Sequence, residues 1–358
     1  MQTRALTQST SNSLMTPFTI LSTVNWVAQE TYSEFGLFQP NKSKAALERQ
    51  YTDENSEFIQ VGDARIHYRD EGNPDGETLV LLHGTYSSLH TWDGWLEELG
   101  EEFRLVRLDM PGFGLTGPRT DAAQTVAGLV RTVGEFCDAL ELTDVTIAGN
   151  SLGGGIAWRV ATVRPDLVSK LILINAGGAT LLSTLSTSLM NFGTEFVQQY
   201  VTPRMIVRLI LYDAYYDKSK LSESLVRRYH DLLLRPGNRS AVVEIASNYR
   251  NQHFNGEYAF DQSFPRLPSG YAPEPQVWDD YDIAEVAVPT LFQWGCEDEW
   301  LPCEFGRELA ESVDDSRFIV YDQVGHIAME EDPVRTATDA AAFIRGSQIG
   351  DAAGDCEC

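Results

Sequence analysis

The chain has 358 residues, 43% of them hydrophobic, which is enough to bury the core of one large α/β domain or of two ordinary domains. Its 52 Asp and Glu residues outnumber 27 Lys and Arg, and the formal net charge is −25 at pH 7. Nucleic acid and anionic lipid both require a positive patch on the protein, and no basic cluster offsets this charge, so neither is expected as a partner.

The acidic charge also bears on where the protein works. Like charges at this density repel one another across the surface, whereas roughly 1 M salt shortens the screening length to ~3 Å. Few of the basic residues are lysines, and the isoelectric point is about 4.5. These features resemble proteins of salt-loving cytoplasms, so we expect a cytoplasmic protein of a halophile; the alternative is an ordinary acidic enzyme.

Residues 1–52 are expected to form a polar, weakly helical N-terminal extension. Its most apolar stretch, residues 14–28, is interrupted by polar residues and is shorter than the ~20 residues that a membrane span needs. Only Arg4 precedes it as a basic residue, so the pattern fits a signal peptide poorly. We expect no transmembrane span but a helix lying on the protein or peripherally on a membrane surface.

Short apolar runs bounded by turn residues predict the strands. Residues 57–61 and 64–70 flank Gly62-Asp63 and predict a hairpin. Continuous apolar runs, as in strands buried on both faces, follow at 79–83, 103–109, 145–149, 170–175, 290–294 and 317–321.

Helical patterns lie between these runs, at residues 121–140, 152–164 and 333–345. Strands that alternate with helices predict an α/β fold, with a mostly parallel central sheet covered by helices on both faces. The core is assigned to residues 53–177 and 286–347.

The alternation stops between residues 178 and 285. This segment is aromatic and helical in pattern, is rich in Pro and Gly from 264 to 275, and contains no run typical of a buried strand. It predicts an inserted helical cap, or lid. Residues 348–358 are small, polar and acidic, and are expected to form a disordered tail.

The strongest motif is Gly149-Asn150-Ser151-Leu152-Gly153, which follows a predicted strand and opens a predicted helix. A serine oxygen projects there from a sharp turn that only flanking glycines allow, and the helix N-terminus directs free N–H groups at a developing oxyanion. The alternative is a glycine-rich helix start with a capping serine.

A second motif, Leu82-His83-Gly84-Thr85, follows another apolar strand. The N–H of Thr85 is the predicted oxyanion donor beside that of Leu152, and His83 is expected to be structural, its ring held by loop carbonyls. The alternative is a plain strand-end turn.

Gly112, Gly114 and Gly117 spell the pattern G-x-G-x-x-G, which is typical of dinucleotide sites. Pro118 and the polar residues after it provide no helix start on the third glycine, so no helix N-terminus would meet a pyrophosphate. We therefore expect no cofactor.

No metal site is expected either, because no His or Cys cluster has ligand spacing and Cys356-Glu357-Cys358 offers too few ligands. The odd count of five cysteines argues against a disulfide framework.

The segments HGTYSS, DMPGFG and GNSLGG, in this order, resemble the α/β-hydrolase superfamily, in particular its cap-bearing, esterase- or lipase-like serine hydrolases. The resemblance covers residues 57–347. It implies a catalytic order of Ser151, then an acid after a late strand, then a histidine. WGCED is similar to the family's W-G-x-x-D and selects Asp298, although Glu297 and Glu299 remain competitors; the histidine is His326.

The resemblance implies hydrolysis of a carboxylic ester of a small or medium apolar substrate through a Ser-His-Asp triad and an acyl-enzyme. Ser151 argues against dehalogenases and epoxide hydrolases, which use Asp. The alternative is a carbon–carbon bond hydrolase of meta-cleavage products. Those enzymes usually carry Trp after the histidine, where Ile327 stands here, and G-P-G in the oxyanion loop. A non-catalytic binding protein on the same fold is the third possibility.

Overall fold

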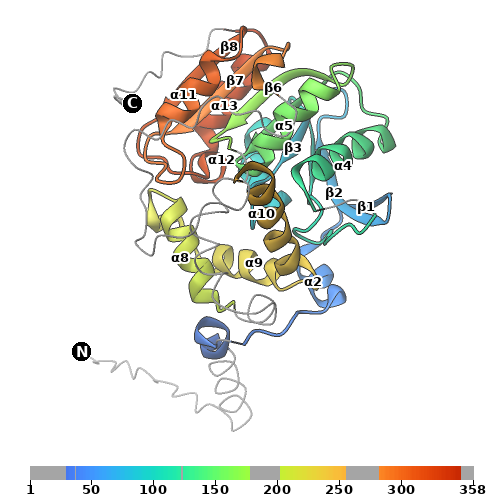
Figure 1. The fold of residues 1–358 in the computed structure, drawn as a ribbon, viewed down its shortest axis with the longest axis vertical. Coiled ribbons are helices and arrows are strands. Elements are labelled where there is room, and N and C mark those ends of the chain that lie inside the picture. The colour runs from blue at the N-terminus through green and yellow to red at the C-terminus, as the bar shows by residue number, and fades with distance from the viewer. Residues whose placement is uncertain (1–29, 37, 122–123, 178–201, 255–281, 348–358) are drawn as a thin grey trace, which may run out of the picture.

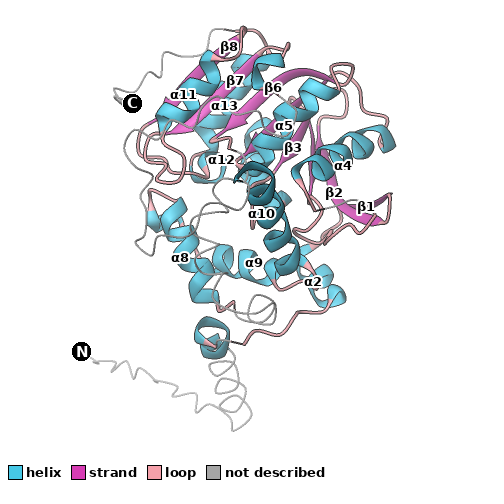
Figure 2. Cartoon of the chain, in the orientation of Figure 1, coloured by secondary structure: helices cyan, strands magenta, loops and turns pink. Residues whose placement is uncertain are grey.

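The computed structural model describes residues 30–36, 38–121, 124–177, 202–254 and 282–347. Their centre is one eight-stranded sheet of order β1-β2-β4-β3-β5-β6-β7-β8, drawn in magenta in Figure 2. The strands are β1 (Ser56–Val61), β2 (Ala64–Gly72), β3 (Thr78–Leu82), β4 (Arg104–Leu108), β5 (Val145–Asn150), β6 (Val168–Ile174), β7 (Thr290–Gly295) and β8 (Ser316–Tyr321).

The first strands form the antiparallel edge. β1 and β2 make the predicted hairpin, in which Gly62 has φ +56, and β2 also pairs antiparallel with β4. All pairs from β4 to β8 along the sheet are parallel. The predicted fold class and every predicted strand are confirmed, with bounds that differ by one or two residues.

Alternating side chains of one strand enter two different cores. In β3, Val80 and Leu82 pack with α4 (Val126–Ala139) and α5 (Leu152–Val163) on one face of the sheet. Leu79 and Leu81 pack on the other face with α3 (Asp93–Leu99) and α13 (Pro333–Ile344). Because successive side chains point to opposite faces, a strand covered on both faces is apolar at every position.

Within the described residues, the segment between β6 and β7 forms helices joined by short loops and contains no strand. It forms α8 (Arg204–Ala214), the short helix η3 (Lys218–Lys220), α9 (Glu223–Leu233) and α10 (Asn238–Phe254). Figure 1 shows α8 and α9 below the sheet, with α10 reaching up toward it. The predicted cap is also expected to include residues 178–201 and 255–281, which lie outside the described residues.

The described part of the N-terminal extension packs on these cap helices. Asp231 of α9 accepts hydrogen bonds from Tyr51 Oη at 3.0 Å and pairs with Lys42 at 2.6 Å. Leu47, in α2 (Lys44–Tyr51), shares a small apolar cluster with Leu232 of α9. Figure 1 shows the same neighbourhood of α2 and α9.

Within the ranges described, no helix combines the length and apolar character needed to cross a membrane. Residues 14–28 are outside these ranges.

The cysteines differ in their bonding. Cys137 is a buried free thiol, but Cys296 and Cys303 each take part in a disulfide bond. The odd count of cysteines argued against a disulfide framework, yet these two cysteines are disulfide-bonded, because a count does not tell which thiols the fold brings together.

Candidate active site

Ser151 lies between the last residue of β5 and the first residue of α5. Its backbone has φ 53 and ψ −119, a region that non-glycine residues rarely occupy and that costs about 1–3 kcal/mol. The side chain is largely buried, with 7% of the residue's surface exposed. The predicted nucleophile thus stands on the strained strand-to-helix turn that the motif predicts.

Neighbouring glycines make this turn possible. A Cβ atom at Gly149 would lie 2.3 Å from the carbonyl oxygen of Gly153, and one at Gly153 would lie 2.3 Å from that of Leu82. A Cβ atom at Gly84 would come within 3.2 Å of Ser151 Cβ. The loop that carries Gly84 therefore lies directly against the turn that carries Ser151, and any side chain at these positions would push them apart.

Asp298 and His326 form a buried pair. The His326 Nδ1 and Asp298 Oδ2 atoms are 2.7 Å apart, and the other oxygen, Oδ1, accepts hydrogen bonds from the N–H groups of Trp300 and Leu301 at 2.8 and 3.0 Å. His326 Nε2 is buried and has no hydrogen-bond partner within the described part of the chain. This is the nitrogen that would accept the serine proton in a triad.

The serine turn and the histidine loop are tied together by Asn150. Its amide Nδ2 donates to the carbonyl oxygen of His326 at 3.0 Å and to that of Ile174 at 3.1 Å. The three candidate residues follow the carboxyl ends of β5, β7 and β8, which meet at one edge of the parallel sheet. That edge is where ligands bind in open α/β folds.

The competing acids do not contact His326. Glu297 Oε2 accepts the backbone N–H of Val324 at 3.0 Å, and the Glu299 side chain is exposed to solvent. Of the three neighbouring carboxylates, the structure places Asp298 against the imidazole.

Asn175, which the sequence analysis did not single out, completes the surroundings of Asp298. It follows β6 with φ 43, is fully buried, and donates from Nδ2 to Asp298 Oδ2 at 2.7 Å. Its own Oδ1 accepts the N–H of Gly295 at 3.3 Å. The only signal in the sequence is an Asn at the end of an apolar run, which also occurs at ordinary strand ends.

The predicted oxyanion donors come from two adjoining segments. Leu152 opens α5, so its N–H belongs to the first turn, where helical N–H groups have no partner within the helix. Thr85 lies in the turn that follows Gly84. Their positions beside Ser151 are compatible with the predicted role, which stays a prediction.

The His83 ring holds the loop that carries Gly84 and Thr85 through hydrogen bonds at both of its nitrogens. Its Nδ1 lies 2.7 Å from the carbonyl oxygen of Gly84, and its Nε2 accepts the N–H of Met110 at 3.0 Å. Complete burial lowers the pKa of His83, which favours the neutral ring that this pattern of one donor and one acceptor requires. The ring is held by one carbonyl and one N–H group, rather than by carbonyls alone as predicted.

The cap contacts the histidine loop directly. The N–H of His326 donates to the carbonyl oxygen of Ala214, the last residue of α8, at 2.7 Å. Glu331, at the end of α12 (Ala328–Glu331), accepts the N–H groups of Gly325, Tyr216 and Asp217 at 2.8, 3.2 and 2.6 Å. One buried carboxylate therefore joins the residue before His326 to the cap.

The acid loop is joined to the same end of α8. Trp300 Nε1 donates to Asp213 Oδ2 at 2.5 Å, and its ring centre lies 4.7 Å from that of His326. Neither this contact nor that of Glu331 was predicted, because they join segments far apart in the sequence.

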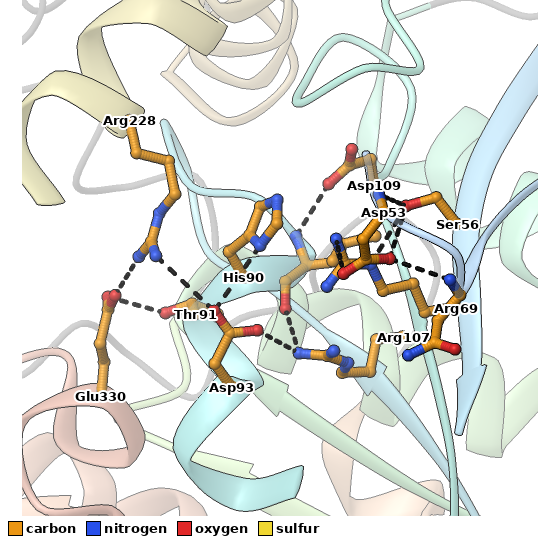
Figure 3. A network of polar contacts seen from close by, with 12 residues as sticks. Asp53, Ser56, Arg69, His90, Thr91, Asp93, Arg107, Asp109, Arg228 and Glu330 are labelled. Carbon is orange, nitrogen blue, oxygen red and sulfur yellow. Dashed lines mark hydrogen bonds and ion pairs between the residues drawn. The ribbon is translucent and has the colours of Figure 1, made fainter. Parts of the chain in front are cut away.

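A second polar network, shown in Figure 3, connects α9 with the core. Glu330 pairs with Arg228 and accepts a hydrogen bond from Thr91 at 3.0 Å. Glu330 also accepts one from Tyr229 at 2.6 Å. Burial, followed by the charge of Glu330, raises the pKa of Tyr229, so the phenol remains a donor.

The other histidines serve packing or polar contacts. His67 is buried with Nδ1 2.8 Å from Asp109, His230 is buried in α9, and His90 lies 3.6 Å from Asp93. The side chain of His253 lies outside the described residues. In the ranges that are described, no group of three or more His, Cys, Asp or Glu residues could hold a metal ion.

A mostly parallel sheet with a serine on the strained turn after β5, and a histidine after β8 at the same edge of the sheet, defines a hydrolase of the α/β type. Residues 77–333 match the family described as alpha/beta hydrolase fold. The chain belongs to this family.

Relatives include hydrolases of different substrates. The chain is 24% identical over 291 residues to an uncharacterised hydrolase of Bacillus subtilis, an alignment of 80% of this chain and 96% of that protein. It is 25% identical over 280 residues to the 2-hydroxy-6-oxo-6-phenylhexa-2,4-dienoate hydrolase of Comamonas testosteroni, covering 76% and 88%. A thermophilic esterase from Thermogutta terrifontis has a similar fold, with a TM-score of 0.62, 21% identity and coverage of 81% and 98%.

Proposed function

We propose that this hydrolase cleaves carboxylic esters of small or medium apolar substrates, with Ser151, His326 and Asp298 as its catalytic triad. The observation that carries the proposal is the buried His326–Asp298 pair, whose Nε2 is unoccupied within the described residues, at the same sheet edge as the strained Ser151. A histidine so held by a carboxylate is equipped to take a proton from a serine hydroxyl.

In the proposed reaction, Ser151 Oγ attacks the ester carbonyl while His326 Nε2 takes the hydroxyl proton. The oxyanion is stabilised by the N–H groups of Thr85 and Leu152, and Asp298 stabilises the imidazolium. Collapse expels the alcohol, which receives the proton from His326, and leaves an acyl-enzyme. Water then attacks the acyl group while His326 takes its proton; the bond to Ser151 Oγ breaks, His326 returns the proton to that oxygen, and the carboxylic acid departs.

A second candidate is carbon–carbon bond hydrolysis of a meta-cleavage product. It is favoured by the Comamonas testosteroni relative, a 2-hydroxy-6-oxo-6-phenylhexa-2,4-dienoate hydrolase. Two sequence features weigh against it in this chain. Ile327 stands after His326, where such enzymes usually carry Trp, and the oxyanion loop reads HGTYSS without G-P-G.

The test is a panel of p-nitrophenyl esters of graded acyl length, run beside 2-hydroxy-6-oxo-6-phenylhexa-2,4-dienoate in low and in molar KCl. We expect kcat/KM for the best ester to exceed that for the dienoate by at least about 100-fold. The reverse order would establish the carbon–carbon hydrolase. Turnover of neither substrate class, together with no labelling of Ser151 by a fluorophosphonate, would instead favour the non-catalytic binding protein.

A further inference from the structure

Helix α8 is apolar on two sides. Its inner side packs Val207, Leu211 and Ala214 into the core cluster on one face of the sheet. An outer row is nevertheless exposed to solvent: Met205, Leu209 and Tyr212 at helical spacing, and Tyr216 two residues after the helix ends. A surface helix needs only one apolar side for folding, so the fold does not account for the outer row.

A second exposed apolar group lies on the chain just before α2. Residues 30–35 form a helix, and Tyr32, Phe35 and Phe38 are exposed in and after it. These three residues and the outer row of α8 are seven of the nine large hydrophobic side chains exposed in the described ranges. Such clustering marks an interaction surface, whereas single exposed apolar residues do not.

Two ion pairs hold helix 30–35 beside α8. Arg204 pairs with Glu30 at 2.7 Å, and Arg208 pairs with Glu34 at 2.9 Å. The two arginines are one helical turn apart in α8, and the two glutamates are one turn apart in helix 30–35, so the helices lie side by side. Leu209 and Phe35 each directly follow a member of the second pair and are 59% and 60% exposed. Figure 1 shows α8 in the part of the molecule farther from the sheet, with the dark blue helix 30–35 below it. We call these seven residues the α8 face.

We propose that the α8 face docks on the surface of a neutral phospholipid membrane. Residues 5–29 contain no charged side chain in a chain that is 22% charged, and this run ends at Glu30, the first residue of helix 30–35. Aromatic and aliphatic side chains on one side of a helix are the features of segments that lie in the membrane interface.

A second copy of this chain fits the α8 face less well than a membrane does. A second copy of the chain would bring two molecules of net charge −25 together, whereas a zwitterionic bilayer presents no such repulsion. The apolar stretch 14–28, which precedes helix 30–35 in the sequence, has 15 residues and is too short to span a bilayer.

The test is flotation of the full-length protein with phosphatidylcholine vesicles at fixed KCl. All proteins carry Ser151→Ala, so that binding is measured without hydrolysis and independently of the proposed function. We expect the protein to float with the vesicles. The double variant Phe35→Asp/Leu209→Asp should lower the partition coefficient at least about tenfold, because both changes place charge where the face would enter lipid.

The matched control is Val163→Asp/Val334→Asp, which adds the same charge at two exposed apolar residues elsewhere (38% and 54% exposed). It should float like the parent, and both doubles in the Ser151 background should turn over p-nitrophenyl acetate equally, which shows that they fold. Equal loss of flotation in both doubles, or a parent that stays unbound at millimolar lipid, would overturn the proposal. So would an unbound dimer that Phe35→Asp/Leu209→Asp converts to a monomer, because the face would then join two copies.

Discussion

At the scale of single residues, the strained turn at Ser151 carries one atom of interest, the hydroxyl oxygen that we propose attacks the substrate. Ser151→Ala removes this oxygen and keeps the backbone, so we expect ester turnover to fall by about 10⁴-fold or more while the thermal midpoint is unchanged or higher. Steady-state kinetics and a thermal melt check both parts. Retention of more than a tenth of the activity would refute the assignment of the nucleophile.

Asp298 accepts four hydrogen bonds, from His326, Asn175, Trp300 and Leu301. In Asp298→Asn, one carboxylate oxygen becomes an NH₂ group that cannot accept a hydrogen bond from these donors. The imidazole of His326 would also lose the negative charge that holds its tautomer. We expect kcat to fall by roughly 10³–10⁴-fold.

Glu297→Gln is the matched control for that variant. A glutamine can still accept the N–H of Val324, so we expect less than about a threefold change in kcat. A severe loss in Glu297→Gln with a mild one in Asp298→Asn would show that the acid has been chosen wrongly.

At the scale of secondary structure, the end of α8 is part of the scaffold of the candidate triad. Ala214 holds the His326 backbone, Asp213 holds Trp300 against the imidazole, and Glu331 joins the histidine loop to the first residues after the helix. The cap helix and the two loops that carry Asp298 and His326 should therefore move and unfold as one unit.

Glu331→Gln tests this connection. Both carboxylate oxygens accept backbone N–H groups, so an amide leaves at least one donor facing another donor. Each lost charge-assisted bond should cost about 1.5–3 kcal/mol of stability. We also expect kcat to fall more than KM rises, because His326 is displaced. Glu299→Gln, an exposed neighbour of Asp298, is the control, and equal kinetics in the two variants would contradict the connection.

At the scale of the whole molecule, the net charge of −25 governs how stability depends on salt. Charges in an unfolded chain lie farther apart, so repulsion opposes the folded state, and raising the salt from 0.1 M to 1 M shortens the screening length from ~10 Å to ~3 Å. We expect the thermal midpoint to rise between 0.1 M and 2 M KCl, with activity retained or increased.

Chloride is preferred to sulfate in that experiment because sulfate also strengthens apolar burial. Sucrose, an uncharged osmolyte, is the control that separates charge screening from exclusion of the solute. A midpoint that stays flat or falls across the KCl series would remove the halophile hypothesis and leave an ordinary acidic hydrolase.

The amino-acid sequence by itself determined the α/β class, the strands, and the pattern around Ser151. These features depend on local physics: a strand buried on both faces must be apolar at every position, and a sharp turn beside a serine must have glycine flanks. Asp298 and His326 could also be selected from the sequence, but only through their resemblance to family motifs at the ends of late strands.

Only the tertiary structure decided which groups surround these residues. Asn175 approaches Asp298 from β6, Glu331 binds the cap across more than a hundred residues of sequence, and α8 exposes an apolar row that periodicity alone would assign to a core. Each of these contacts joins segments that are distant in the chain. A pattern records which way a side chain points along its own helix or strand, whereas its partner is set by how whole elements pack.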